Sequence, residues 1–384
     1  MDFELNQDQR AFADTAAQFA RDSLEPNAAK WDEEQIFPKS VLRQAGELGF
    51  LSLYTPEEKG GLGLSRLDAS IIFEQLAMGC TSTTAFMTIH NMVTWMVASF
   101  ATERAATQFC PKLISGEWLG SYCLTEPNAG SDAASLTTSA KKVADGYLLN
   151  GSKVFISGAG ETDVLVVMAR TSDEGAKGVS AFVVAADSQG ISYGRKEPKM
   201  GWNSQPTRSI SFDNVLVAKE NLLGEEGQGF VFAMKGLDGG RINIATCSLG
   251  TAQQALNLAI GYLKERKQFG QPLGQFQALQ FKLADMATEL VAARQMVRLA
   301  ASKLDNQHPD ASTYCAMAKR FATDVGFRVC DKALQLYGGY GYIKEYPLER
   351  YFRDVRVHQI LEGTNEIMRL IVARRLLADG AEQL

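Results

Sequence analysis

Apolar side chains recur at helical spacing near the start of the chain. Segments 40–48 and 67–78 carry apolar residues three and four positions apart, which is typical of helices with one buried face. Between them lies a glycine-rich loop, EEKGGLGLS (57–65). Residues 1 to about 118 are therefore predicted to be helical. The positions nearest the N-terminus that fall near one face are Phe3, Gln7, Phe12 and Phe19.

From about residue 120 to 218 the pattern changes to short β-forming runs. Asn150-Gly151 separates 147–149 from 152–156 and predicts a hairpin, because both residues of this pair tolerate the positive φ of a type I′ turn. No long helical pattern interrupts this region, so we expect a largely antiparallel sheet rather than a doubly wound one. The other runs are rich in valine and bounded by Gly, Asp and Ser: 164–169, 179–185 and 209–215.

Helical spacing returns at about residue 229, most clearly in 279–304. Its apolar positions follow alternating steps of 4 and 3, which predicts the seam of a bundle helix roughly 40 Å long. A second helix through 318–336 is expected to stop at Gly338-Gly339, and a third includes 367–377. The seam consists of Leu279, Leu283, Met286, Leu290, Ala293, Val297, Ala300 and Leu304.

These changes of pattern predict an α+β fold that is mainly α. A length of 384 residues is typical of two or three domains. We expect an N-terminal helical domain (1–119), a central antiparallel β domain (120–228) and a C-terminal four-helix bundle (229–384).

Composition excludes several classes of protein. With 46% hydrophobic and 22% charged residues, the chain resembles an ordinary folded protein. The formal net charge is −5 and no Lys/Arg run exceeds two residues, so no nucleic acid is expected as a partner. Apolar stretches end in charge before the roughly 18–20 residues that a membrane span needs, so no membrane is expected either.

Cysteine and histidine usage predicts neither disulfides nor a metal site. None of the six cysteines forms a C-x-x-C pair, which favours buried free thiols in a reducing compartment. The three histidines are far apart in the sequence, so no metal site is expected. The N-terminus lacks the basic and apolar regions of a signal peptide. We expect a cytoplasmic chain, or a mitochondrial matrix chain if it is a processed eukaryotic one.

Two glycine-rich segments do not fit the standard nucleotide-binding motifs. GYLLNGSK (146–153) has its final Ser and Lys in the wrong order for a phosphate loop, and GGYG (338–341) lacks the strand–turn–helix setting of a dinucleotide fingerprint. YCLTEPNAGSD (122–132) is a better candidate. A strand end followed by a polar turn exposes N–H groups and hydroxyls that can bond a heterocycle and a phosphate, although an ordinary polar loop would look the same.

Seven motifs along the whole chain resemble those of the acyl-CoA dehydrogenases. YCLTEPNAGSDAASL (122–136) resembles the family's first signature and RYFRDVRVHQILEGTNEIMRLIVAR (350–374) its second. The resemblance implies an FAD enzyme that oxidises an acyl-CoA thioester to the 2,3-enoyl-CoA. The other motifs follow in the family's order: FISGA (155–159), GLDGGRI (236–242), ERKQFGQPL (265–273), FQALQ (276–280) and QLYGGYGY (335–342).

Glu362 matches the family's catalytic base, which removes the α-proton of the thioester. Ile360 and Leu361 flank it with apolar bulk, and desolvation there would raise the pKa of the carboxyl and make it a better base. Some members carry the base immediately before the residue that matches Arg241, but here that position is Gly240. The family also implies that the backbone N–H of Glu362, together with a flavin hydroxyl, holds the thioester oxygen.

The resemblance assigns further positions around the cofactor and the substrate. Phe155 stands where many relatives have Trp, and Tyr337 departs from the usual His. The substrate positions are implied to be Ser131, Asp238, Gly239, Gly240, Arg241 and Arg374. The FAD positions are implied to be Tyr122, Leu124, Thr125, Ser131, Phe155, Ile156, Ser157, Arg266, Phe276, Gln277, Gln335, Leu336, Gly338, Gly339, Thr364, Asn365 and Glu366.

The resemblance also implies partners and a substrate class. The segments 266–277 and 335–339 resemble those that grip FAD from a neighbouring subunit, so we expect a homo-oligomer, a tetramer built as a dimer of dimers.

GWNSQPTRSISF (201–212) is most similar to members that act on isobutyryl-CoA, a short branched acyl-CoA, and pass electrons to an electron-transfer flavoprotein. A straight short-chain or 2-methylbutyryl-CoA substrate stays open. So do two other classes: an oxygen-using flavoenzyme on this scaffold and a non-catalytic helical interaction protein.

Overall fold

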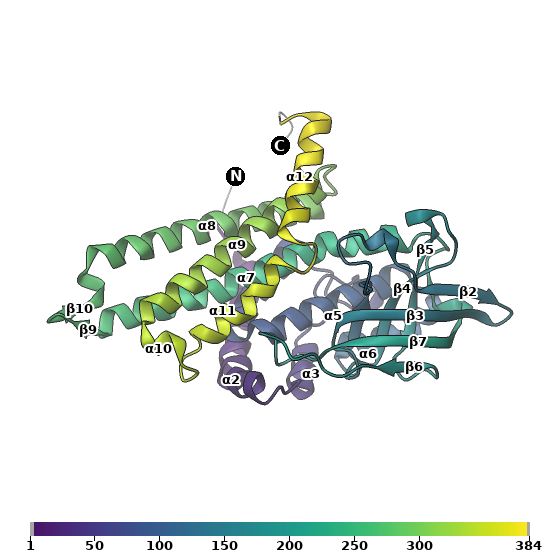
Figure 1. The fold of residues 1–384 in the computed structure, drawn as a ribbon, viewed down its shortest axis with the longest axis horizontal. Helices are drawn as coiled ribbons and strands as arrows, with labels where there is room; N and C mark the ends of the chain where they lie inside the picture. Colours follow the sequence, from purple (N-terminus) through teal and green to yellow (C-terminus); the bar gives the residue numbers. More distant parts are fainter. Residues whose placement is uncertain (1–3, 382–384) are drawn as a thin grey trace.

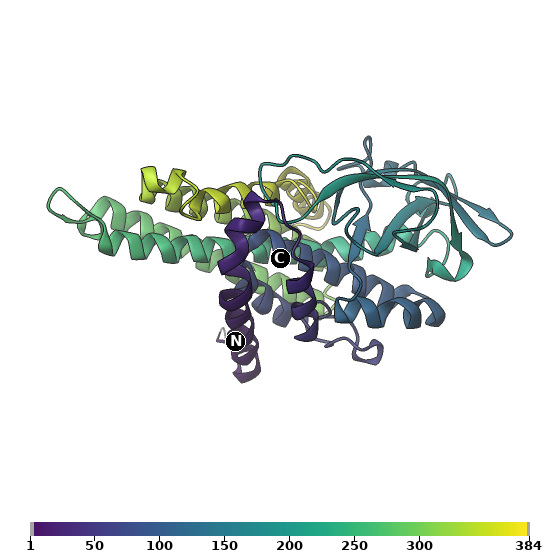
Figure 2. The same cartoon turned by 90° about the horizontal axis from the view of Figure 1, so that it is seen from below.

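The computed structural model describes residues 4–381, a mainly helical chain with a sheet at one end (Figure 1). Phe3 lies outside the described residues, whereas Phe12 and Phe19 pack into the N-terminal core as expected. In Figure 2 the purple N-terminal helices run across the long axis of the molecule, along which the green C-terminal helices extend. The N-terminal helices are α1 (Gln7–Phe19), α2 (Glu25–Glu33), α3 (Lys39–Glu47), α4 (Arg66–Gly79), α5 (Thr81–Phe100) and α6 (Glu103–Ser115).

The sheet has eight strands in the order β6-β7-β3-β2-β4-β5-β8, with β1 beside β4. β1 and β4 run parallel, and β2 meets β4 in parallel at Ser139 and Arg170, while the other pairs are antiparallel. The expected largely antiparallel sheet is confirmed. Its strands are β1 (Gly120–Cys123), β2 (Ser139–Val143), β3 (Gly146–Ser157), β4 (Val164–Arg170), β5 (Val179–Ala185), β6 (Ile191–Tyr193), β7 (Thr207–Ala218) and β8 (Leu222–Leu223).

The predicted hairpin at Asn150-Gly151 is wrong. Both residues lie inside β3, where the pairing with β7 shifts register between Leu149 and Gly151. The chain turns instead at 144–145, just before Gly146, whose Cβ would lie 2.1 Å from the carbonyl oxygen of Val217. The positive φ of Gly151, 145°, serves a bulge rather than a turn, which the same residue pair suits equally well.

Helix α7 (Gly229–Glu265) connects the sheet to the helical bundle. It has 37 residues and is about 55 Å long. Its first turns pack Phe232 and Ala233 with α5, β4 and β5, and its later turns pack against α8 and α9. The following elements are β9 (Lys267–Gln268), β10 (Gln271–Pro272), α8 (Gln277–Asp305), α9 (Ala311–Tyr337), α10 (Gly339–Tyr342), α11 (Leu348–Arg356) and α12 (Asn365–Asp379).

The predicted bundle seam lies on α8. Met286, Leu290 and Val297 are buried between α7 and α9, and Leu279 and Leu304 pack partly buried against the same core. α9 ends at Gly338, as the sequence predicts, with φ 59° at that residue. The third predicted helix is α12, which projects from the bundle (Figure 1) and buries few of its apolar residues.

Three further observations concern the cysteines, metal binding and membrane spans. All six cysteines are free and buried, which confirms the expectation from the sequence. Within residues 4–381, no group of three or more His, Cys, Asp or Glu side chains is arranged to hold a metal ion. Over the same range, no helix combines the length and the apolar character needed to cross a membrane.

Candidate active site

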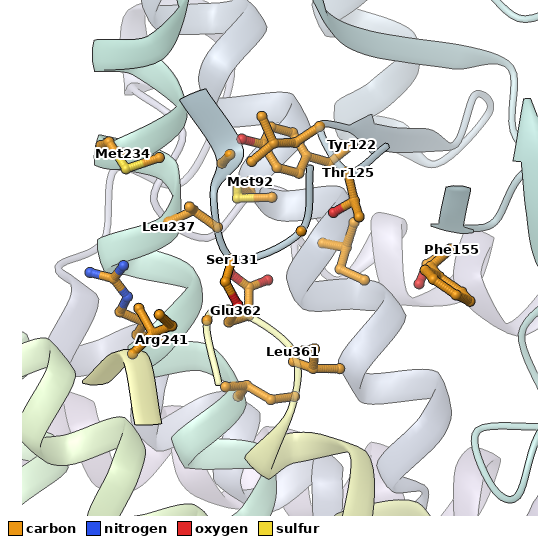
Figure 3. Close-up of a pocket in the computed structure, with 18 of the residues that line it drawn as sticks. Met92, Tyr122, Thr125, Ser131, Phe155, Met234, Leu237, Arg241, Leu361 and Glu362 are labelled. Carbon is orange, nitrogen blue, oxygen red and sulfur yellow. The ribbon is translucent and has the colours of Figure 1, made fainter. Parts of the chain in front are cut away.

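A cavity of about 380 Å³ lies where the sheet, α5, α7 and the loop before α12 meet (Figure 3). We call it the central cavity. Its lining comes from segments that are far apart in the sequence, which the fold brings to one place. The residues predicted from the sequence that line it are Tyr122, Leu124, Thr125, Ser131, Phe155, Ile156, Ser157, Arg241 and Glu362.

Glu362 lies in the loop between the 3₁₀ turn Val357–Gln359 and α12. Its φ is 56°, a left-handed backbone conformation that costs a non-glycine residue about 1–3 kcal/mol. The surrounding structure must therefore hold it in place. Its Oε2 is buried and has no hydrogen-bond partner among the described residues. Burial raises the pKa of this carboxyl to about 7, although Arg241 and Lys319 act to lower it. The group can therefore exchange a proton near neutral pH.

Gly240 on α7 faces this carboxylate. A Cβ at position 240 would lie 2.5 Å from Oε2 of Glu362, well inside van der Waals contact. The missing side chain at this position therefore leaves the space that the carboxylate occupies.

Arg241 is the positive charge on the cavity side of α7. Its Nη1 donates to Oδ1 of Asp238 at 2.6 Å, and its Nε is buried without a partner among residues 4–381. Asp238 also accepts from Ser312, so it orients Arg241 and does not line the cavity. Gly239 lies against Arg66, and a Cβ added at position 239 would be 2.5 Å from its guanidinium. Of the predicted substrate positions, Ser131 and Arg241 line the central cavity.

A buried ion pair joins the two strand segments beside the cavity. Nζ of Lys153 donates to Oε1 of Glu126 at 2.8 Å and to the carbonyl of Leu124 at 3.1 Å. The side chains of Lys153 and Glu126 are 0% and 4% exposed. Burial by itself would raise the pKa of Glu126, but the charge of Lys153 and the bonds from 137–138 hold it down at about 2.

Both partners lie in segments that the sequence singles out. Glu126 belongs to the Leu-Thr-Glu-Pro motif, and Lys153 to the run 152–156 predicted to be one strand of a hairpin. Because Val154 N–H also donates to the carbonyl of Thr125 at 2.9 Å, the two lining segments are fixed to each other.

Other predicted cofactor residues lie at the opposite end of the molecule. Arg266, Gln335, Leu336, Gly338 and Gly339 line a second cavity of about 540 Å³, which we call the distal cavity. It lies beside β9 and β10, far from the sheet in Figure 1. One chain therefore does not bring the two groups of predicted FAD residues together.

Aromatic side chains surround the distal cavity. The guanidinium carbon of Arg266 lies 5.7 Å from the ring centroid of Tyr340. Tyr337, which replaces the histidine expected from the family, stacks on Tyr262 at 4.2 Å and donates its hydroxyl to the carbonyl of Leu258 at 3.2 Å. Phe276 and Gln277 begin α8 next to this cavity and do not line it.

Four predicted residues on α12 or at its start lie outside both cavities. Thr364 caps α12 by accepting the N–H of Ile367 at 3.3 Å. Asn365 is buried and bonds to α9. Glu366 points to solvent near Arg369, and Arg374 is exposed.

The central cavity fits the polar and apolar edges of a flavin ring. Hydroxyls of Thr125, Ser131 and Ser157 line it, and the buried hydroxyl of Tyr122 has no partner among the described residues. Phe155 lines the same cavity with φ 57° and a side chain that is 71% exposed, so its ring is free to cover a ligand. Buried polar atoms usually have hydrogen-bond partners, so the unpaired ones here favour a bound ligand.

Sequence reasoning missed the residues from the interior of the protein. Ala85, Thr88, Ile89 and Met92 of α5 line the central cavity, with Trp202, Met234 and Leu237. α5 is buried on nearly all sides, so it shows no polar face by which its cavity side could be recognised.

Comparison with known proteins gives one consistent family. The acyl-CoA dehydrogenase N-terminal, middle and C-terminal domain families match residues 6–117, 121–215 and 227–377. Mitochondrial isobutyryl-CoA dehydrogenases from Bos taurus and Dictyostelium discoideum are each 54% identical, over 98% of this chain and 90% of theirs. The structure of butyryl-CoA dehydrogenase from Megasphaera elsdenii aligns with a TM-score of 0.95 and 40% identity, covering 98% of this chain and 100% of that one. The chain therefore belongs to the acyl-CoA dehydrogenase family of FAD-dependent oxidoreductases, which act on CH–CH groups.

Proposed function

We propose that this enzyme dehydrogenates isobutyryl-CoA to methacrylyl-CoA, with Glu362 as the base. The observation that carries the proposal is the carboxyl of Glu362, which has a buried, unpaired Oε2 beside the cavity that fits the flavin. Burial raises its pKa to about 7, so near neutral pH the carboxylate is a stronger base than an exposed glutamate when a bound substrate excludes water.

The residues of this chain would perform the proton transfer. The ionised carboxylate of Glu362 takes the α-proton, and the electrons of that C–H bond form the new double bond as the β-hydrogen leaves with its own electron pair. The backbone N–H of Glu362 would hold the thioester oxygen and stabilise the charge that develops there. FAD, when bound, supplies the acceptor for the hydride at its N5. The electrons would then pass to an electron-transfer flavoprotein.

The lining of the central cavity supports a small acyl group. Met92, Met234 and Leu237 provide apolar surface near Glu362 (Figure 3). An apolar pocket discriminates by roughly 1–3 kcal/mol per methylene, so neighbouring substrates should overlap. Butyryl-CoA and 2-methylbutyryl-CoA are expected to react more slowly, whereas octanoyl-CoA has four more carbons to place and should react poorly.

A homotetramer would explain the two separate groups of predicted FAD residues. The distal cavity of one subunit would meet the central cavity of another, so that one FAD contacts both. The names of the bovine and Dictyostelium relatives include the word mitochondrial, which supports a mitochondrial location if this chain comes from a eukaryote.

The decisive experiment measures anaerobic flavin bleaching and kcat/KM with isobutyryl-, butyryl-, 2-methylbutyryl- and octanoyl-CoA. We expect the purified protein to be yellow, and isobutyryl-CoA to bleach it fastest. If octanoyl-CoA reacts best, the substrate assignment is wrong while the reaction class stands. Oxygen consumption that keeps pace with substrate oxidation, with no acceptor protein added, would instead identify an oxygen-using flavoenzyme.

A further inference from the structure

The loop that carries Glu362 lies against a buried lysine of α9. The side chain of Lys319 is fully buried. Its Nζ donates to the carbonyl of Gly363 at 2.7 Å and to Oδ1 of Asn365 at 2.9 Å. The first of these bonds is made to the residue directly after Glu362. A buried ammonium group is costly, so its position directly behind this loop requires an explanation.

A second residue of α9 fixes both ends of the same loop. Oδ1 of Asp324 accepts from Nε2 of Gln359 at 2.8 Å and from Nδ2 of Asn365 at 2.8 Å. Gln359 precedes residues 360–364 and Asn365 follows them. One carboxylate therefore holds the two ends of the five-residue loop, and Lys319 bonds to the backbone of Gly363 within it.

The backbone of this loop needs such support. Glu362 and Gly363 are both left-handed, with φ of 56° and 85°. Glycine adopts this conformation readily, but glutamate does not. If the loop relaxed, the carboxylate of Glu362 would leave the space opposite Gly240 that it now fills.

We propose that Lys319 and Asp324, acting with Asn365, form a clamp on α9 that positions Glu362 for proton abstraction. These are positioning residues, since none of them lines the central cavity. The inference rests on the proposed role of Glu362, but the bonds that define the clamp can be tested without any turnover.

Lys319 also acts on Glu362 through its charge. The groups that face Glu362 are Arg241 from α7, Lys319 from α9, Tyr122 from β1 and Tyr54 from the N-terminal domain. Of these, Lys319 is the one that also bonds to the loop. Burial lowers the pKa of Lys319 to about 7, and the neighbouring Glu362 acts to raise it.

The first test is amide hydrogen exchange of peptides covering 357–368 in the FAD-loaded protein. Lys319→Met keeps the length of the side chain and removes the ammonium. We expect exchange at least about tenfold faster than in the wild type, because the bonds that hold the loop are lost. Arg328→Met is the matched control, since it removes a half-exposed cation from the same helix that pairs with Glu289. Equal exchange in Lys319→Met, Arg328→Met and the wild type would overturn the clamp.

The second test separates positioning from general stability by kinetics. Lys319→Met should lower kcat on the order of 10–100-fold with a much smaller change in KM, because small misplacements of a reacting group are costly. The pH midpoint of kcat/KM should move upward, because Glu362 of the free enzyme loses a neighbouring positive charge. A purely structural role would leave that midpoint in place, so an unshifted profile or an unchanged kcat contradicts the proposal.

Asp324→Ala keeps the inference testable if Lys319→Met does not fold. Asp324 is partly exposed at 18%, so its removal is expected to be tolerated. It should speed exchange of 357–368 and lower kcat, because it removes the bonds to Gln359 and Asn365 at the two ends of the loop. Unaltered exchange in this variant also refutes the clamp. If no acyl-CoA bleaches the wild-type flavin, the proposed function fails, but the exchange comparison still decides whether the clamp exists.

Discussion

The central and distal cavities hold predicted cofactor residues in very different surroundings. The central cavity is lined by residues from β1, β3, α5, α7 and the loop before α12, and it contains buried polar atoms without partners. The distal cavity is open and has exposed aromatic neighbours, including Phe269 at 93% and Tyr342 at 81%. The first has buried polar and charged groups, whereas the second has aromatic side chains that are exposed to solvent. Substitutions in the two cavities should therefore have different consequences.

The largest effect is expected at the central cavity, from Glu362→Gln. The amide keeps the shape of the side chain but cannot accept the proton, so flavin bleaching should slow by on the order of 10²–10⁴ or more. FAD and acyl-CoA should still bind. Rapid mixing with isobutyryl-CoA measures the rate, with the exposed Glu174→Gln as control. Bleaching at near the wild-type rate would remove Glu362 from the mechanism.

Lys153→Met should be the next most severe change, and it acts on the structure of the same cavity. It leaves the carboxylate of Glu126 buried without its charge partner, which costs about 3–5 kcal/mol of unfolding free energy. Chemical denaturation measures this loss. The matched control is Lys142→Met, whose ion pair with Glu226 is exposed and should contribute less than about 1 kcal/mol. Similar losses in both variants would show that the buried pair has no special role.

Arg266→Ala tests the distal cavity. If this cavity meets FAD bound to another subunit, the variant should bind FAD more weakly and assemble more weakly. Its affinity for FAD and the affinity between its subunits should each fall by about tenfold, or roughly 1.4 kcal/mol. Sedimentation combined with the flavin absorbance measures both together. Arg104→Ala, an exposed cation near the sheet, should change neither. A stable, FAD-saturated monomer of the wild type would contradict the model of a shared site.

The smallest effect concerns pH. Glu362 has a pKa of about 7, raised by burial, so about half of the free enzyme holds an ionised base at pH 7. Raising the pH from 7 to 9 should increase kcat/KM about twofold, and below pH 6 it should fall about tenfold per unit, since the base must be ionised. A flat profile between pH 6 and 8 would show that burial does not control the base.

Sequence predicted the parts of the molecule whose signal is local. The α8 seam is readable because its steps of 3 and 4 place Met286, Leu290 and Val297 on one side. The Asn150-Gly151 error has the opposite cause, because a residue pair that permits positive φ fits a bulge and a turn alike. The pairing of β3 with β2 on one side and with β7 on the other distinguishes the two, and the second of these contacts is distant in sequence.

In the candidate site, too, the sequence predicted what local motifs carry and missed what depends on packing. Motifs located Glu362 and the 122–131 segment, which the structure places around one cavity. They did not identify Lys153, Lys319 or the cavity side of α5, because burial of a lysine or orientation of an all-apolar helix depends on packing from elsewhere in the chain. The assignments of Arg374 and Glu366 to substrate and cofactor stay predictions, since both side chains are exposed on α12.

The close approach of Gly240 to Glu362 also restricts how this enzyme can evolve. The resemblance to the family implies that some members carry the base at the position of Gly240, but here a Cβ there would lie 2.5 Å from Oε2 of Glu362. The carboxyl is the far end of a flexible side chain, so it would have to leave its present position before residue 240 could carry a second carboxylate. Each single substitution should be a poor enzyme, whereas Gly240→Glu combined with Glu362→Gly should recover part of the rate. Kinetics of the three variants would measure how much activity each single substitution loses and how much the double substitution recovers.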